Sequence, residues 1–213
     1  CGTLFPYTTL FRSVVSAGGG SPDEIHLAVT DPLGNLALPD TTLELTGVDS
    51  VVGRPALVHT GSDLLVAYLS PTTGRNVARV GLDASVASEH SVAATAPGDV
   101  DAAWSGSAAT LVWVEEVDGD PEVHAIVVDD DGVDVGTAVR VTESTGGASQ
   151  VHVDATATAT ALVWIDSRSG DDQVHRAVLD DAGAVIVADG PLTTTGGAVS
   201  PAVSASQRLV GFV

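Results

Sequence analysis

The sequence is short of several residue types, and each shortage narrows the class of protein. It contains no lysine and no methionine, a single cysteine, Cys1, and only 4% aromatic residues. Acidic residues outnumber basic residues by 28 to 8, and the formal net charge of −20 argues against nucleic acid or an anionic membrane as partner. One cysteine provides no disulfide framework. No apolar run reaches the length of a membrane-spanning helix.

An internal repeat is the clearest feature that is present. Its fullest copy, residues 161–183, reads ALVWIDSRSGDDQVHRAVLDDAG, an apolar run ending near Trp164, a polar hairpin, a second apolar run and a D-x-x-G turn. Earlier copies place Trp113 and Tyr68 at the position of Trp164, in steps of 51 and 45 residues, and residues 25–34 repeat the second half alone. Steps of this size indicate a repeat array.

Each unit contains four short β-type runs. In the unit 54–97 they are residues 56–59, 64–69, 76–82 and 90–94, separated by turns rich in Gly, Pro, Asp and Ser. No segment shows a capped helical period. Many runs are apolar on both faces, which requires neighbours on both sides, as propeller blades have. The sequence therefore predicts an all-β fold, a partial β-propeller of four-stranded antiparallel blades. Two tandem β-sandwiches are the alternative, but the repeat is only about half their usual length.

The chain divides into three parts. Residues 3–13, TLFPYTTLFRS, resemble a translated sequencing adapter, so we interpret residues 1–13 as an artefact and expect the chain to be a fragment of a longer protein. Residues 14–22 are a Gly/Ser-rich linker. Residues 23–213 are the expected propeller fragment, with three full units and a half unit at each end. The expected blades are 23–47 (partial), 54–97, 99–147, 149–197 and 200–213 (partial), the last opening with Pro201-Ala202-Val203 as an echo of Pro55-Ala56-Leu57.

One stretch also carries a family resemblance. Residues 164–175, WIDSRSGDDQVH, resemble the W-x-D-x-R-x-G repeat of secreted bacterial propeller-like proteins, which are distantly similar to sialidase blades. The resemblance implies a propeller fold and an extracellular or cell-surface location. The full motif occurs once, because Glu115 and Ser70 stand at the position of Asp166. The Asp-box signature of sialidases is absent, so no active site is carried over.

An acidic turn is the candidate cation site. Asp129, Asp131 and Asp134 lie within six residues, a density of carboxylates that suits weak calcium binding, and calcium is the only cofactor considered. However, Asp129 begins a D-x-x-G sequence that also starts at Asp180, and no Glu follows twelve positions on. We therefore interpret the segment mainly as a hairpin in which Asp caps the turn and Gly takes positive φ.

Three of the four copies of the repeat carry a histidine at the same position. When the copies are aligned, the copy that contains Tyr68 has Ala78 at this position. His26, His124 and His175 would form a metal ring only close to the propeller axis, and their third-strand position favours packing between blades instead. Arg168, two residues after Asp166, is either a fork for a substrate carboxylate or a local ion pair that closes the hairpin, and the second interpretation is preferred.

Aromatic residues are the remaining candidates. Tyr68, Trp113 and Trp164 are expected to pack between blades, whereas Trp104 belongs to a first strand near the central channel and is the candidate ligand contact. No catalytic or cofactor-binding residues are identified, and there is no nucleophile elbow or phosphate loop.

Together these features favour a non-catalytic binding or scaffold segment outside the cell. Its expected ligand is a carbohydrate or a protein, and the remaining blades of the parent chain are further expected partners. The alternatives are part of a glycoside hydrolase, sialidase-like enzyme or lyase, and a structural segment of a large surface protein.

Overall fold

The computed structural model shows an all-β chain. It describes residues 24–30, 33, 35–46, 51–92, 99–143, 147–194, 196–197, 200–206 and 209–212. Segments 1–13 and 14–22 lie outside these described residues, as do Asp31 and Gly34 of the first D-x-x-G sequence. Within the described ranges there is no helix, and hence none that could cross a membrane.

Three four-stranded antiparallel sheets are complete, and each follows the chain order. They consist of β3 (Val52–His59), β4 (Leu64–Ser70), β5 (Gly74–Val80) and β6 (Val86–Ser91); β7 (Val100–Trp104), β8 (Ala109–Val117), β9 (Asp120–Val128) and β10 (Val139–Arg140); and β11 (Ala148–Thr156), β12 (Ala159–Asp166), β13 (Gln173–Asp180) and β14 (Val185–Pro191). Two-stranded sheets flank them: β1 (His26–Thr30) with β2 (Leu36–Thr42), and β15 (Ala202–Ser204) with β16 (Leu209–Gly211).

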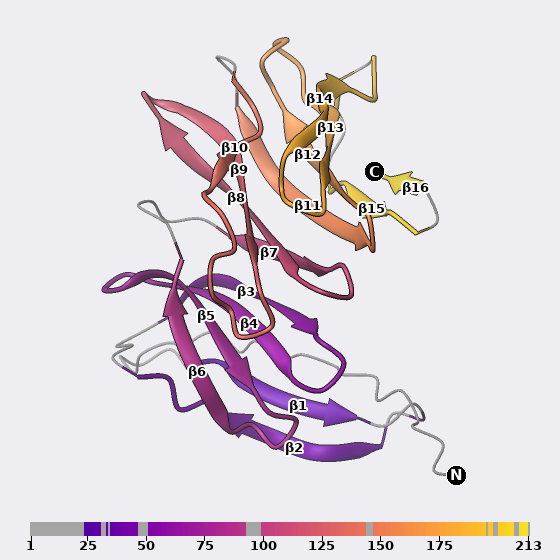
Figure 1. The fold of residues 1–213 in the computed structure, drawn as a ribbon. Helices are drawn as coiled ribbons and strands as arrows, with labels where there is room; N and C mark the ends of the chain where they lie inside the picture. Colours follow the sequence, from indigo (N-terminus) through magenta and orange to yellow (C-terminus); the bar gives the residue numbers. More distant parts are fainter. Residues whose placement is uncertain are drawn as a thin grey trace.

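The sheets are arranged as successive blades. The first strands lie side by side, β7 contacting both β3 and β11, and β11 contacting β15. The fourth strands β6, β10 and β14 form the other edge of each sheet (Figure 1). This arrangement confirms the predicted partial propeller of four-stranded blades, with three full units and a half unit at each end.

The repeated aromatic occupies matching places in the three complete blades. Tyr68, Trp113 and Trp164 each lie near the end of a second strand and are at most 1% exposed. Their partners on the third strand are Asn76, His124 and His175, respectively. The prediction that these aromatics pack in the core is confirmed, and each buries a large apolar area of about 150–250 Å².

Each aromatic packs against the preceding blade. Trp164 shares a core cluster with Val123 of the blade before it. At the equivalent place the guanidinium of Arg75 lies 4.2 Å above the Trp113 ring, a cation–π contact between blades. Arg75 is fully buried, and this burial lowers its pKa to about 10, although the Glu115 carboxylate acts in the opposite direction. The contact between neighbouring blades, which we call the seam, is therefore made by the same aromatic position each time. Its partner on the preceding blade differs, being apolar for Trp164 and cationic for Trp113.

The register corrects one part of the sequence alignment. Asn76 stands opposite Tyr68 as His124 stands opposite Trp113, so the placement of Ala78 at the histidine position is wrong by two residues. The cause is the hairpin: β8 continues four residues past Trp113, whereas β4 ends two residues past Tyr68.

The D-x-x-G turns connect third to fourth strands and also touch the neighbouring blade. Asp129 accepts hydrogen bonds from the backbone N–H groups of Asp131 and Val133 at 3.0 and 2.9 Å. Gly132 has a φ of +86°, and a Cβ there would lie 2.8 Å from Val77 of the preceding blade. The glycine thus provides both the turn conformation and the close approach between blades.

Substitution of Gly132 separates these two contributions. Gly119 has a similar φ of +94° but open space around it, so Gly119→Ala serves as the control and is expected to cost about 1–2 kcal/mol from backbone strain alone. Gly132→Ala adds overlap with Val77 and is expected to cost about 1–3 kcal/mol more. Urea-induced unfolding measures both, and equal losses would show that the inter-blade contact contributes nothing.

Candidate functional site

Two of the first strands, β3 and β11, are irregular near their starts. The pairing of β3 with β4 is interrupted between Val52 and Ala56, and that of β11 with β12 between Ser149 and His152. Gly53 and Gln150 adopt positive φ in these bulges, +73° and +51°. Bulges redirect side chains and are frequent at functional sites, because they interrupt the regular alternation of a strand.

Four residues occupy one equivalent position near the start of each first strand. In each blade, the second-strand residue just before the position of the repeated aromatic pairs with one first-strand residue. These first-strand residues are Ala56, Asp101, His152 and Ala202 in successive blades, and the equivalent position lies two residues before each of them. We refer to these four residues as the axial positions: Arg54, Asp99, Gln150 and Ser200.

All four axial positions line a single cavity of about 480 Å³. Its wall also includes Ser149 and His152, and its apolar part includes Val114 and Val151. The four axial side chains are exposed to solvent. Since four successive blades contribute to it, the cavity is a product of the blade array and exists in no single repeat.

Hydrogen bonds between blades hold the axial backbone in place. The N–H of Arg54 donates to Asp99 Oδ1 at 3.1 Å, and the N–H of Ser200 donates to Gln150 Oε1 at 3.1 Å. Further along the strands, Val153 N–H donates to Asp101 Oδ2 at 3.1 Å, and Asp101 also contacts His152 Nδ1 at 3.2 Å. The polar side chains therefore bridge first strands that share no sheet.

The chemistry of the cavity suits recognition. Arg54 supplies a planar cation with several N–H donors, and Gln150, Ser149 and Ser200 supply both donors and acceptors. Among the described lining residues Asp99 is the one carboxylate, and one of its oxygens already accepts a bond from Arg54.

The predicted ligand contact Trp104 lies elsewhere. It ends β7, on the first strand as expected, but at the opposite end of that strand from Asp99. Its side chain is partly buried against the core cluster that contains Trp113. It does not line the cavity, so its role in binding stays a prediction.

The acidic turn is engaged in local and inter-blade contacts. Asp129 caps the turn, and Asp131 pairs with Arg79 of the preceding blade. Burial raises the pKa of Asp134, which stands opposite Val128. In the part of the chain that the structure describes, no cluster of three potential ligands could hold a metal ion. Calcium binding at this turn stays a prediction.

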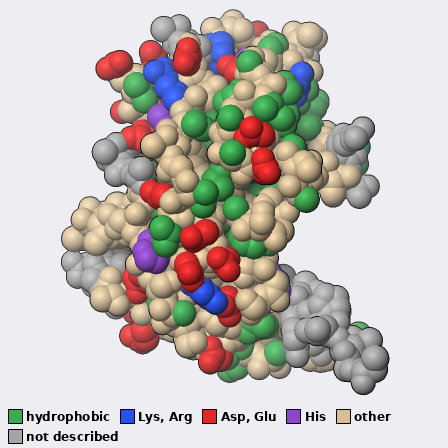
Figure 2. Space-filling model, in the orientation of Figure 1, with side chains coloured by type: hydrophobic (Ala, Val, Ile, Leu, Met, Phe, Trp, Pro, Cys, Tyr) green, Lys and Arg blue, Asp and Glu red, His purple; other side chains and the backbone are tan. Residues whose placement is uncertain are grey.

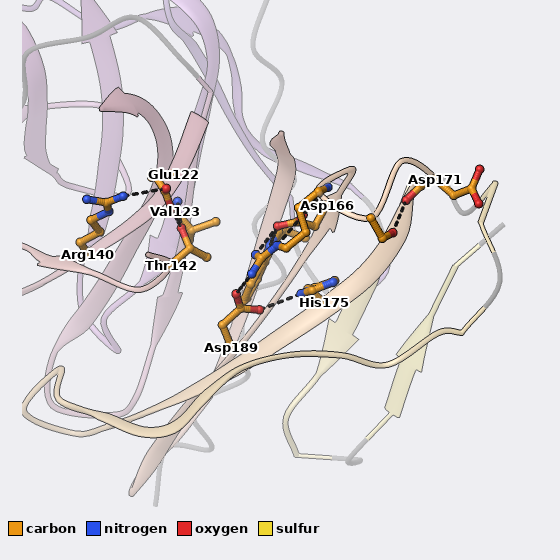
Figure 3. A network of polar contacts seen from close by, with 11 residues as sticks. Glu122, Val123, Arg140, Thr142, Asp166, Asp171, His175 and Asp189 are labelled. Carbon is orange, nitrogen blue, oxygen red and sulfur yellow. Dashed lines mark hydrogen bonds and ion pairs between the residues drawn. The ribbon is translucent and has the colours of Figure 1, made fainter. Parts of the chain in front are cut away.

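The W-x-D-x-R stretch forms a polar network inside its own blade (Figure 3). Arg168 Nε donates to the buried Asp166 at 2.8 Å, and its Nη1 lies 2.5 Å from Asp189. Asp189 accepts a hydrogen bond from His175 Nδ1 at 2.7 Å, and Trp164 Nε1 donates a hydrogen bond to Asp166 at 3.3 Å. The preferred interpretation of Arg168 as an ion pair closing the hairpin agrees with these contacts, which extend to the fourth strand.

The repeated histidines do not converge on a metal. His26 pairs with Asp40 at 3.2 Å, as His175 pairs with Asp189, whereas His124 stacks on Trp113 with ring centroids 5.8 Å apart. Two of the three histidines therefore pair with a carboxylate of their own blade, whereas the Nε2 of His124 is buried without a hydrogen-bond partner among the described residues.

The axial positions were missed by the sequence reasoning. Their residue types differ in every copy, so no repeat marks them. The only signal was the shared Pro-Ala pair that follows Arg54 and Ser200, which marks a first strand without indicating that the preceding residue faces a cavity.

Comparison with known proteins supports the architecture. TolB from Acinetobacter baumannii is similar to the chain with a TM-score of 0.57 and 14% identity, over 97% of this chain and 46% of that one. A putative TolB from Agrobacterium tumefaciens gives a TM-score of 0.59 and 14% identity, over 96% of this chain and 69% of that one. The chain folds as part of a β-propeller. At this identity the likeness concerns the fold alone, and the chain spans about half the length of the Acinetobacter protein.

Sequence comparison adds no narrower assignment. No family model matches the chain, and no curated protein sequence matches it.

The buried carboxylate of Asp166 makes stability depend on pH. Burial alone would raise its pKa, but hydrogen bonds from the side chain and backbone of Arg168 and from Trp164 hold it below the ordinary 3.8. Its stabilising contribution is therefore present at neutral pH and is lost as the pH falls through the lowered pKa. Asp166→Asn is expected to cost about 3 kcal/mol at pH 7, and less under strongly acidic conditions.

Urea unfolding at a series of pH values checks this, with Asp181→Asn in an exposed turn as control. The control is expected to change stability by no more than ~0.5 kcal/mol. A loss in Asp166→Asn that is the same at every pH would contradict the role of the carboxylate charge.

Proposed function

We propose that this chain is a non-catalytic binding module whose axial cavity receives a segment of a protein ligand. The observation that carries the proposal is the convergence of Arg54, Asp99, Gln150 and Ser200, from four blades, on one cavity. Its volume of about 480 Å³ falls in the range of ligand sites, about 300–1,000 Å³.

The wall of the cavity matches a polypeptide better than a sugar. Amide and hydroxyl groups at Gln150, Ser149 and Ser200 complement backbone N–H and C=O groups, and Val114 and Val151 provide apolar contact. Among the described lining residues there is no Trp, Tyr or Phe ring on which a sugar could stack. Tyr68, Trp113 and Trp164 are buried in the core, where a sugar cannot reach their rings. The chemistry of the wall therefore favours a protein over a carbohydrate ligand.

A carboxylate on the ligand is the expected anchor. Arg54 is the one arginine that lines the cavity among the described residues, and it is exposed. Guanidinium groups bind carboxylates through two parallel hydrogen bonds. A ligand side chain of Asp or Glu, or a C-terminal carboxylate, would supply that partner. The extracellular setting implied by the family resemblance stays a prediction.

Selection from a random dodecapeptide library displayed on phage tests this function. Binding peptides are expected to share a carboxylate, and a synthetic copy of the strongest is expected to bind Arg54→Gln at least tenfold more weakly in calorimetry, since a charged hydrogen-bonded pair is lost. Arg79→Gln, which removes the same charge from a surface ion pair outside the cavity, is the control and is expected to retain affinity. Equal affinity for both variants, or no enrichment, would overturn the proposal.

A further inference from the structure

One histidine lies among the described residues that line the axial cavity. It is His152, which stands on β11 where the bulge ends, two residues past the axial position Gln150. Its side chain is 28% exposed, so the ring is partly held by the protein and partly open to solvent. Histidine changes its charge between about pH 5 and 8. This residue can therefore alter the charge of the cavity wall under mild conditions.

His152 is tied to a carboxylate of the neighbouring blade. The equivalent place in successive blades is held by Ala56, Asp101, His152 and Ala202, so two titratable side chains stand in adjacent blades between two alanines. His152 Nδ1 lies 3.2 Å from Asp101 Oδ2. An ionised carboxylate only accepts hydrogen bonds, so the ring donates its Nδ1–H to Asp101.

The bond to Asp101 determines which nitrogen of the ring gains a proton. Among the described residues the other nitrogen, Nε2, has no hydrogen-bond partner. In the neutral ring Nε2 is an acceptor, because the hydrogen stays on Nδ1. In the protonated ring Nε2 becomes a donor and the ring carries a positive charge. Protonation of His152 thus changes both the charge and the hydrogen bonding of the wall.

The charged groups around His152 come from several strands. Arg54 and Asp99 share the cavity wall with it, and Asp101 bonds to it from β7. β12 and β15 present the uncharged Val163 and Ala202 at the same level. The other titratable groups on β11 and on the strands that contact it lie outside the cavity wall: Glu115, Glu116, Asp120, Glu122, His124, Asp154 and Asp166.

We propose that His152 is a second recognition residue of the axial cavity, and that its protonation strengthens the binding of a ligand carboxylate. The inference rests on the proposed function, in which Arg54 anchors that carboxylate. A cavity of about 480 Å³ is comparable in width with one Debye length, about 10 Å at 0.1 M salt, so charges on its wall are only partly screened from a ligand inside it. The ligand is held more tightly in mildly acidic than in mildly alkaline solution.

The probe for this inference is a peptide whose own charge is constant. It is a synthetic copy of the strongest peptide from the phage selection, acetylated at its N-terminus and made without histidine or cysteine. Between about pH 6 and 8 its carboxylate then stays ionised and none of its other groups titrates. Any pH dependence of binding therefore comes from the protein.

Calorimetry at two pH values gives the first readout. The parent chain is expected to bind the peptide about threefold more tightly at about pH 6 than at about pH 8, the magnitude of an exposed charge pair. His152→Gln, which cannot take up a proton, is expected to bind equally at both. His59→Gln, at an exposed histidine outside the cavity, is the control and is expected to keep the pH dependence of the parent. A pH dependence that persists in His152→Gln would overturn the inference.

Proton uptake on binding is a second readout and needs no variant. Because protonation and ligand binding are reciprocally linked, the parent chain is expected to take up protons when it binds the peptide near neutral pH. Calorimetry in two buffers of different ionisation enthalpy measures this uptake. A peptide that loses affinity in Arg54→Gln but binds the parent without proton uptake would overturn the role of His152 and leave the proposed function standing. Failure of the parent chain to bind any selected peptide would overturn both.

Discussion

The whole array depends on one contact, the aromatic ring at the end of a second strand packed against the third strand of the preceding blade. A four-stranded blade has two apolar faces and cannot cover either alone. Trp113 and Trp164 cover these faces in the same way, because each ring is buried between two blades. The indole N–H of each donates a hydrogen bond to a carboxylate two residues further on, Glu115 or Asp166. The ring is thus buried without leaving its polar atom unsatisfied.

This constraint determines where variation is tolerated. Apolar seams fix the blades side by side, while the first strands β3 and β11 carry bulges near the axial positions. Gln150 and Ser200 take positive φ, each at 51°, at the axial positions, and their backbone is held by contacts with neighbouring blades. The cavity follows from the packing of the array, while its chemistry is set by side chains that differ from blade to blade. Figure 2 shows the exterior, where acidic side chains are spread over several blades.

The sequence predicts the repeated contact well and the site poorly, for physical reasons. Aromatic spacing and doubly apolar strands are local signals of a buried seam, so the fold and the burial of Trp113 could be anticipated. The fourth strand of the first full blade was placed at 90–94 but runs from Val86 to Ser91, because an outer strand has few apolar residues to mark it. The bulge around Arg54 depends on packing between blades, which are far apart in the sequence. The residues next to Arg54 in the sequence therefore do not predict the cavity that Arg54 lines.

Hydrogen exchange of the three tryptophan indole N–H groups, followed by NMR, tests the central claim most directly. Trp113 and Trp164 are fully buried and bonded to carboxylates, whereas Trp104 is only partly buried. The blade array predicts slow exchange for Trp113 and Trp164, limited by opening of the seams, and fast exchange for Trp104. Exchange of all three at the same fast rate would show that the repeated rings do not lie between blades and would contradict the account.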